Sequence, residues 1–142
     1  MCLSLLGTWP GGGKAEKWAA ATSSMLQLLV SIQSLIFVDQ PFFNEPGYEA
    51  SMATPDGKRR SDAYNRRIHM ATVRYGMIDL IRHPPAEFAQ VIRLHFKHKG
   101  AQVIDTAARW AEEAKAAMGD NSTDPVIVND EMVKTLKELL AQ

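Results

Sequence analysis

The sequence of 142 residues is poor in cysteine, and its single cysteine is Cys2. One cysteine cannot form an internal disulfide, and it cannot supply the several thiolates of a structural zinc site. Cys2 is therefore either a packed apolar side chain or a reactive thiol. We expect no cofactor and no bound metal.

Net charge is also lacking, because 16 basic residues balance 16 acidic ones. A protein that binds nucleic acid or an anionic membrane would need an excess of basic residues, so we expect neither kind of binding. The longest apolar run, residues 25–38, is interrupted by Gln27, Ser31, Gln33 and Ser34 and is too short and too polar to cross a bilayer. The first nine residues lack the charged start of a signal peptide. We expect an intracellular protein, cytoplasmic or nuclear, with no membrane contact.

No segment has the alternating pattern of a strand, and several have helical spacing. The sequence predicts a mostly α-helical chain, with helices over residues 22–38, 62–83, 86 onward and 130–141. Ser24 and Gln27 fit a capping box at the start of the first helix. Apolar residues lie on two faces of that helix, which predicts that it is buried on most sides at the centre of the fold.

The segments between the helices carry loop signals. Residues 39–48 contain Pro41, Pro46 and Gly47, and the polar residues 49–62 contain a turn signal at Pro55-Asp56-Gly57. The charge run Lys58-Arg59-Arg60 is interpreted as a solvated loop.

The later helices are predicted from their apolar faces. Gly100 is expected to interrupt or bend the third helix, and Asn129 is a plausible N-cap of the last one. Residues 95–99 combine two histidines with two lysines, but no third metal ligand is evident there. The expected apolar faces comprise Tyr64, Ile68, Ala71, Tyr75 and Ile78, then Phe88, Val91, Ile92 and Phe96, then Val103, Ala107, Trp110, Ala111 and Ala114.

Three segments resemble ubiquitin-conjugating enzymes. Residues 2–9, Cys-Leu-Ser-Leu-Leu-Gly-Thr-Trp, are similar to the segment around that family's active-site cysteine. Residues 26–37, with Val-Ser-Ile-Gln-Ser-Leu-Ile at 30–36, resemble the helix that follows it. Residues 41–49, Pro-Phe-Phe-Asn-Glu-Pro-Gly-Tyr-Glu, resemble the large, apollon-like type that includes hybrid conjugating-enzyme/ligase proteins. The resemblance covers about residues 1–99 and fades beyond Gly100.

The resemblance implies the C-terminal helical half of an α/β (α+β) fold, with the first helix and the sheet missing. It implies a partial core domain over residues 1–99. The residue pattern itself predicts a helical extension over residues 100–118, then a linker and an amphipathic helix over residues 119–142. In the family a His-Pro-Asn motif precedes the cysteine, and no such triplet occurs in this sequence.

The resemblance also implies a chemistry. Cys2 would accept ubiquitin as a thioester from the activating enzyme, and a substrate lysine would then attack it, guided by a ligase. Glu45, with Asn44 as a second candidate, would orient that lysine. In the family, the asparagine of the His-Pro-Asn motif would stabilise the oxyanion of the reaction. Because that motif does not occur in this sequence, we expect the transfer to be impaired in this chain.

The residues and the resemblance together leave two hypotheses open. One is an enzyme of ubiquitin conjugation with Cys2 as acceptor, and whether this chain is active is left uncertain. The other is a non-catalytic helical interaction protein in which Cys2 is inert and Glu45 is a solvated charge. An apolar face that the absent sheet would have covered predicts self-association or another partner.

Overall fold

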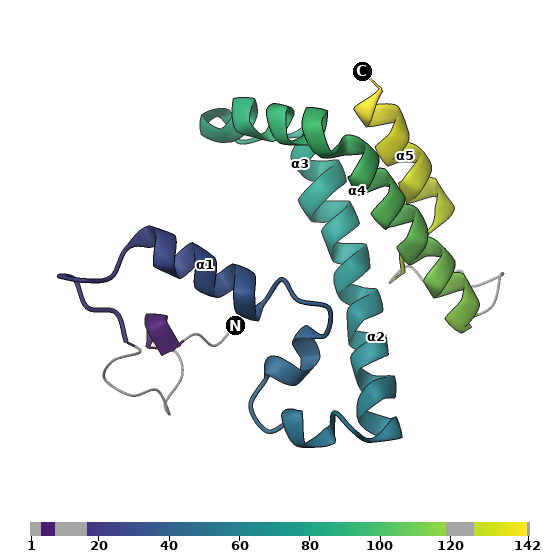
Figure 1. The fold of residues 1–142 in the computed structure, drawn as a ribbon. Coiled ribbons are helices and arrows are strands. Elements are labelled where there is room, and N and C mark those ends of the chain that lie inside the picture. Colours follow the sequence, from purple (N-terminus) through teal and green to yellow (C-terminus); the bar gives the residue numbers. More distant parts are fainter. Residues whose placement is uncertain (1–3, 8–16, 119–126, 142) are drawn as a thin grey trace. The chain divides into compact units, whose positions relative to one another are not determined.

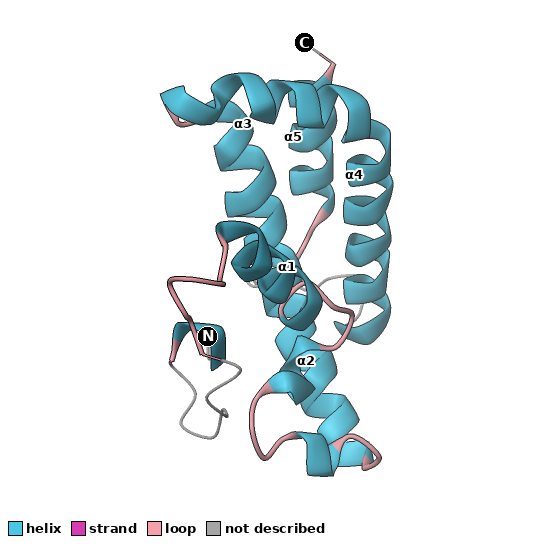
Figure 2. Ribbon diagram, turned by 60° about the vertical axis from the view of Figure 1, so that its left-hand side comes forward, coloured by secondary structure: helices cyan, strands magenta, loops and turns pink. Residues whose placement is uncertain are grey.

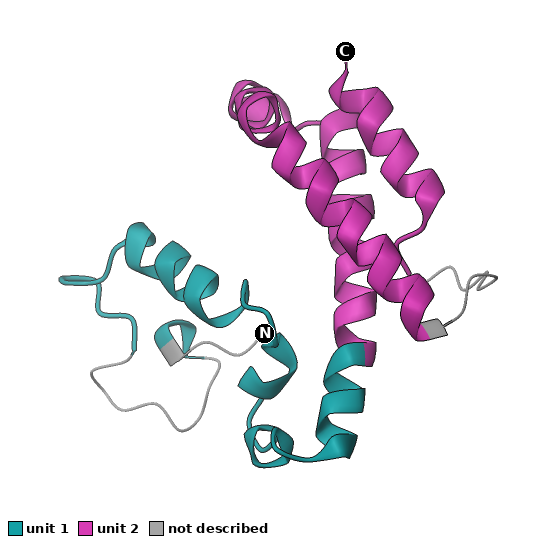
Figure 3. Ribbon diagram, turned by 45° about the vertical axis from the view of Figure 1, so that its right-hand side comes forward, with its two compact units in different colours: residues 1–62 teal, residues 63–142 magenta. Residues whose placement is uncertain are grey.

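The computed structural model describes residues 4–7, 17–118 and 127–141, and it divides into two compact units, residues 1–62 and residues 63–142 (Figure 3). Within the described residues all regular structure is helical and no strand is present, as Figure 2 shows. The prediction of a mostly α-helical chain is confirmed. In the part of the chain described, no helix is both long enough and apolar enough to cross a membrane.

The first unit contains the short 3₁₀ helix η1 (Ser4–Leu6) and a well-capped helix, α1 (Met25–Leu35). The Ser24 hydroxyl accepts a hydrogen bond from the Gln27 amide at 3.3 Å, and the Gln27 side chain accepts one from the Ser24 amide at 2.8 Å. This reciprocal pair satisfies two amides at the start of the helix that have no partner within it. The predicted capping box is confirmed.

The prediction that α1 is buried on most sides is wrong for this chain, because α1 has no buried residue. Leu26 is 69% exposed and Leu29 is 56% exposed. The spacing of apolar residues identifies the faces that would favour burial, but it does not supply a surface to cover them. The described residues leave much of this apolar surface open.

Helix α2 (Pro55–Ala71) begins where the sequence predicts a turn, and that prediction is also wrong. Thr54 caps the helix, since its carbonyl accepts from the Lys58 amide and its hydroxyl accepts from the Gly57 amide, both at 3.0 Å. Proline at the first helical position is tolerated because its missing N–H would have no helical partner there. A Cβ on Gly57 would lie 2.0 Å from the Ser51 carbonyl oxygen, so only glycine fits this approach.

The helix continues from α2 into η5 (Thr72–Asp79), which is π-helical, and ends in α3 (Leu80–Arg82). Val73 and Ile78 are buried, at 0% and 6% exposure. Val73 and Ile78 lie five residues apart, and in an α-helix their side chains would point about 140° apart. A π-helix has i→i+5 hydrogen bonds, so it brings residues at this spacing to one side. Ile78 is buried as predicted. The predicted burial of Tyr64, Ile68 and Tyr75 is wrong, since they are 40%, 39% and 58% exposed. The core contacts a different face of this helix, which carries Met70 and Val73.

The core of the second unit lies where η5, α4 (Ala89–Met118) and α5 (Asp130–Leu140) pack together (Figures 1 and 2). The predicted alanine stripe of α4 is buried, with Ala107, Ala111 and Ala114 at 0%, 1% and 2% exposure. Small side chains allow neighbouring helices to approach closely, and Leu136 of α5 is buried against this region at 0% exposure. Asn129 caps α5 as predicted, because its side chain accepts from the Met132 amide at 3.0 Å.

The start of the third predicted helix is less buried than its pattern indicates. The chain enters α4 through η6 (Ala86–Phe88), and Phe96 is buried at 8% exposure as predicted. Phe88 and Val91 are 61% and 65% exposed, so their predicted burial is wrong. They lie before the part of α4 that contacts α5, and apolar residues at helical spacing do not by themselves specify a neighbour.

One aromatic contact connects α2 to α4. The His69 imidazole stacks on the Trp110 indole with ring centroids 3.9 Å apart and planes 7° from parallel. Burial against the indole lowers the pKa of His69 below its ordinary value, because the imidazolium loses solvent there; Glu113 opposes this shift and Arg109 adds to it.

This depressed pKa predicts that acid weakens the fold. Below the ordinary histidine pKa of about 6.5 the unfolded chain binds a proton that the folded chain resists, so the free energy of unfolding falls between that pH and the lower folded pKa. Urea unfolding from about pH 7.5 to about pH 5.5 would measure the loss. His69→Gln should flatten this part of the profile and the control His98→Gln should keep it. Equal profiles for the two variants would contradict the assignment.

Candidate functional site

The sequence predicts three site residues, and the structure describes two of them. Cys2 lies outside the described residues, as does Trp9 of the same segment. Asn44 and Glu45 are described and exposed, at the end of the short helix η3 (Pro41–Asn44). The geometry of the site is therefore the geometry of the segment that carries Asn44 and Glu45.

Two phenylalanines anchor this segment in the first unit. Phe42 and Phe43 are buried at 7% and 4% exposure, and their rings meet edge to face at a centroid distance of 5.3 Å. Phe42 also stacks on Tyr48, with centroids 4.6 Å apart and planes at 24°. Such aromatic pairs add stability beyond the area they bury. Residues on both sides of Glu45 are thus joined to one aromatic cluster.

Arg60 of α2 covers this cluster. Its guanidinium carbon lies 5.4 Å from the Phe42 ring centroid and 5.3 Å from the Tyr48 ring centroid. A cation over an aromatic face is attracted by the negative potential of the ring. The interpretation of residues 58–60 as a solvated loop is half right: all three residues are exposed, but they are helical, and Arg60 packs on two rings.

Glu45 sits in a turn with a defined backbone. Its amide donates to the Phe42 carbonyl at 3.4 Å, and its carbonyl accepts from the Tyr48 amide at 3.1 Å. The next turn, η4 (Glu49–Ser51), follows directly after Tyr48. Because the main chain makes these bonds, the exposed Glu45 carboxylate projects from a turn that the aromatic cluster supports on both sides.

Asn44 has a structural contact. Its side-chain amide donates to the Leu35 carbonyl at 2.6 Å, at the last residue of α1. The last carbonyls of a helix have no partner within it, so this bond satisfies one of them and links the segment to α1. A catalytic role for Asn44 stays a prediction beside this structural one.

Arg60 is the residue of this segment that the sequence interpretation missed. The signal was the spacing of α2, which places Arg60 in the second turn of a helix that starts at Pro55. Interpreting Pro55-Asp56-Gly57 as a turn removed that helix and left the arginine in a loop. Among the residues described, no group of three His, Cys, Asp or Glu side chains lies close enough to hold a metal ion.

No protein-family model matches the chain. Individual relatives do. The chain is 38% identical over 141 residues to a probable ubiquitin-conjugating enzyme E2 of Acanthamoeba polyphaga mimivirus, an alignment that covers 99% of the chain and 10% of that protein. It is 44% identical over 120 residues to the dual E2 ubiquitin-conjugating enzyme/E3 ubiquitin-protein ligase BIRC6 of Homo sapiens, covering 84% of the chain and 2% of that protein. The probable ubiquitin-conjugating enzyme E2 26 of Arabidopsis thaliana is 45% identical over 104 residues, which are 73% of the chain and 19% of that protein.

The chain therefore belongs with the ubiquitin-conjugating enzymes, as its resemblance to the large type predicts. It matches one segment of these relatives and spans about a tenth or less of the viral and human proteins. The alternative hypothesis of a non-catalytic interaction protein is not favoured, because these relatives are named as conjugating enzymes.

The packing of Arg60 yields a prediction about the Glu45 turn. Arg60→Ala removes a cation from two ring faces at a cost of about 1 kcal/mol. We expect the Tyr48 amide, which donates to Glu45, to exchange its hydrogen roughly fivefold faster. Hydrogen exchange followed by NMR measures this. The control is Arg59→Ala, since Arg59 pairs with Asp56 and has no described contact with the rings. If both variants accelerate exchange equally, the Arg60 contacts do not hold the turn.

Proposed function

We propose that the chain provides the active-site cysteine and the following helices of a ubiquitin-conjugating fold, with Cys2 accepting ubiquitin as a thioester. The observation that carries the proposal is the alignment with the viral relative, which covers 99% of the chain and so includes the segment that begins at Cys2. On this proposal residues 1–99 are a partial core domain, residues 100–118 a helical extension, and residues 119–142 a linker with α5.

The proposed chemistry is a transfer between two thioesters. The Cys2 thiolate attacks the carbonyl carbon of ubiquitin's C-terminal residue on the activating enzyme, and the thiolate of that enzyme leaves. A substrate lysine, brought by a ligase, then attacks the new thioester and releases the Cys2 thiolate. Both steps pass through an oxyanion, and the His-Pro-Asn donor that would stabilise it is not in this sequence. The chain alone is therefore an impaired carrier.

Glu45 acts in the second step of this proposal. A lysine attacks only as a neutral amine, so the protein must take up a proton and hold the amine in line with the carbonyl. An exposed carboxylate on a turn held by Phe42 and Tyr48 is suited to receive a lysine that arrives from solvent. The contacts of that turn support the role, and Asn44 would hold its other end against α1.

Charging of Cys2 is the direct test. Incubation with ubiquitin, activating enzyme and ATP should give a slow adduct that a thiol reductant releases. Cys2→Ala should give none, and Cys2→Ser should give an adduct that resists reductant, because an oxygen ester does not exchange with thiols. Gel electrophoresis with and without reductant distinguishes these results. An adduct on Cys2→Ala, or none on the unaltered chain, would defeat the proposal.

The role of Glu45 predicts a difference between the two steps. Glu45→Gln keeps the size and the turn but removes the proton acceptor. We expect unchanged charging and discharge to free lysine slower by about tenfold or more. The control is Glu49→Gln, a neighbouring exposed glutamate in η4. If Glu45→Gln slows charging as much as discharge, or if Glu49→Gln behaves in the same way, Glu45 does not orient the lysine.

The open apolar surface of α1 predicts self-association. Met25 and Leu26 are 62% and 69% exposed, and Phe37 beyond the helix is 75% exposed. Exposed apolar surface of this kind favours contact with a second copy. Light scattering should show a mass above that of one chain, and a Leu26→Lys, Leu29→Lys variant should return it to one chain. The control is Leu94→Lys, an exposed leucine of α4. A monodisperse single chain without substitutions would rule this out.

A further inference from the structure

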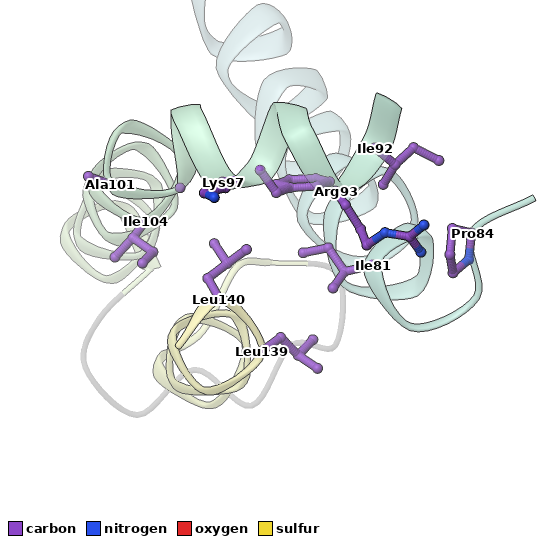
Figure 4. A pocket seen from close by; sticks show the side chains of 11 residues that line it. Ile81, Pro84, Ile92, Arg93, Lys97, Ala101, Ile104, Leu139 and Leu140 are labelled. Carbon is purple, nitrogen blue, oxygen red and sulfur yellow. The ribbon is translucent and has the colours of Figure 1, made fainter. Parts of the chain in front are cut away.

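The second unit contains a pocket of ≈ 650 Å³ between α4, α5 and the end of the helix formed by η5 and α3. This volume is in the range of pockets that hold ligands, about 300–1,000 Å³. In Figure 4 Ile81, Leu139 and Leu140 lie on one side of it and the first turns of α4 on the other. All the residues that line it belong to residues 81–140, so it is independent of the segment that carries Glu45.

The pocket exists because α4 changes direction and carries small residues at the change. Figure 4 shows the turns with Ile92 and Lys97 running across the view, whereas Ala101 and Ile104 lie on turns seen nearly end on. Gly100 lies between them, as the sequence predicts for a bend. A Cβ at Gly100 would lie 3.5 Å from Leu140 Cδ1, and the missing side chain leaves this wall of the pocket unfilled.

The lining consists of two kinds of residue. Nine of the eleven lining residues are apolar side chains or glycine, and the other two are Arg93 and Lys97. No hydroxyl, amide or carboxylate side chain lines it, so its side chains offer cationic donors and no hydrogen-bond acceptor. Its chemistry selects an aliphatic group accompanied by negative charge.

The two cations are not neutralised by the protein itself. Among the residues described, neither Arg93 nor Lys97 forms an ion pair or a side-chain hydrogen bond. No Asp or Glu occurs from residue 88 to residue 104. Glu138, the acidic neighbour of Leu139 on α5, pairs with Lys134 at 3.9 Å. The positive charge at the pocket therefore stays available to a partner.

The spacing of the cations indicates what kind of partner fits. Arg93 and Lys97 are four residues apart on one helix, so their backbones are about 6 Å apart along its axis. Carboxylates four residues apart on a partner helix have the same spacing and can pair with both cations at once. A single carboxylate head group would neutralise only one of them. Two cations at this spacing therefore favour a protein segment over a small aliphatic acid.

We propose that this pocket binds a short amphipathic acidic helix of a partner protein. An aliphatic side chain of that helix enters between Phe96 and Leu140, and two of its carboxylates pair with Arg93 and Lys97. This is recognition of a helix in a groove, in which apolar burial gives affinity and charge gives orientation. The proposal does not depend on charging at Cys2.

Binding of a defined peptide tests the proposal. The probe is a fluorescein-labelled synthetic helix with leucines at i, i+3, i+4 and i+7 and glutamates flanking them, titrated with the full chain and followed by fluorescence anisotropy. Its control replaces each glutamate by glutamine. We expect saturable binding of the glutamate peptide, weakened about tenfold or more in the glutamine peptide and weakened by added salt.

Variants of the chain locate the site. Arg93→Glu with Lys97→Glu should abolish binding, and Arg93→Gln with Lys97→Gln should weaken it, which covers the case in which charge reversal disturbs folding. Ala101→Trp, on the exposed rim, should fill the pocket and block the peptide. Lys99→Glu is the matched control, because Lys99 lies on the same helix and does not line the pocket. Circular dichroism verifies that each variant folds.

NMR separates this site from the apolar surface of α1, which could also attract a leucine-rich peptide. The peptide should shift the amides of Gly100, Ala101 and Leu140. Shifts confined to α1, equal binding of the glutamine peptide, or equal loss in Lys99→Glu would overturn the proposal. The absence of saturable binding would overturn it as well. Saturable binding of sodium dodecanoate at the same amides, with the peptide inert, would assign the pocket to a small carboxylate instead.

Discussion

The close approach of α4 to α5 along a row of alanines is the contact on which the second unit depends. Ala107 and Ala111 have almost no exposed surface, and the same core receives Leu136 from α5 and Val73 from η5. Larger side chains at the alanine positions would push the helices apart and open the core, since interiors are packed to crystal-like density. The pocket lies at the end of this contact, where α4 bends and the row of small residues no longer faces a filled space.

Much of the local structure could be predicted from the sequence, because caps and periodic faces are short-range signals. The helix starts at α1 and α5 are predicted by capping residues that contact the chain only three residues ahead, Ser24 with Gln27 and Asn129. The buried alanine face of α4 is predicted by its helical spacing alone. The failures have a different origin. The pattern Pro-Asp-Gly is compatible with a turn and with a helix start. In the structure it begins a helix, because Thr54 caps the first turn and Gly57 approaches Ser51 closely.

Burial was the less predictable property, since it depends on what lies opposite. The apolar faces of α1 and the exposed Phe88 and Val91 have the spacing of buried residues, yet the described residues place little against them. Family membership could be predicted from residues 41–49, and the relatives confirm it. The roles of Cys2 and Glu45 stay proposals, because a motif specifies residue types and order, whereas a mechanism needs the distance between a thiol and a carboxylate.

The π-helical segment η5 affects whether this helix can lose a residue without changing its orientation. Its extra residue acts as a spacer that brings Val73 and Ile78 onto one side. A π-helical turn holds one residue more than an α-helical turn. Deleting one residue between Val73 and Ile78 would leave them four residues apart, which is about 40° in an α-helix, so ordinary winding would still bring both to the core. This stretch can therefore lose one residue while the following helix keeps its orientation, whereas the loss of one residue from the α-helical turns of α2 would rotate everything after it by about 100°.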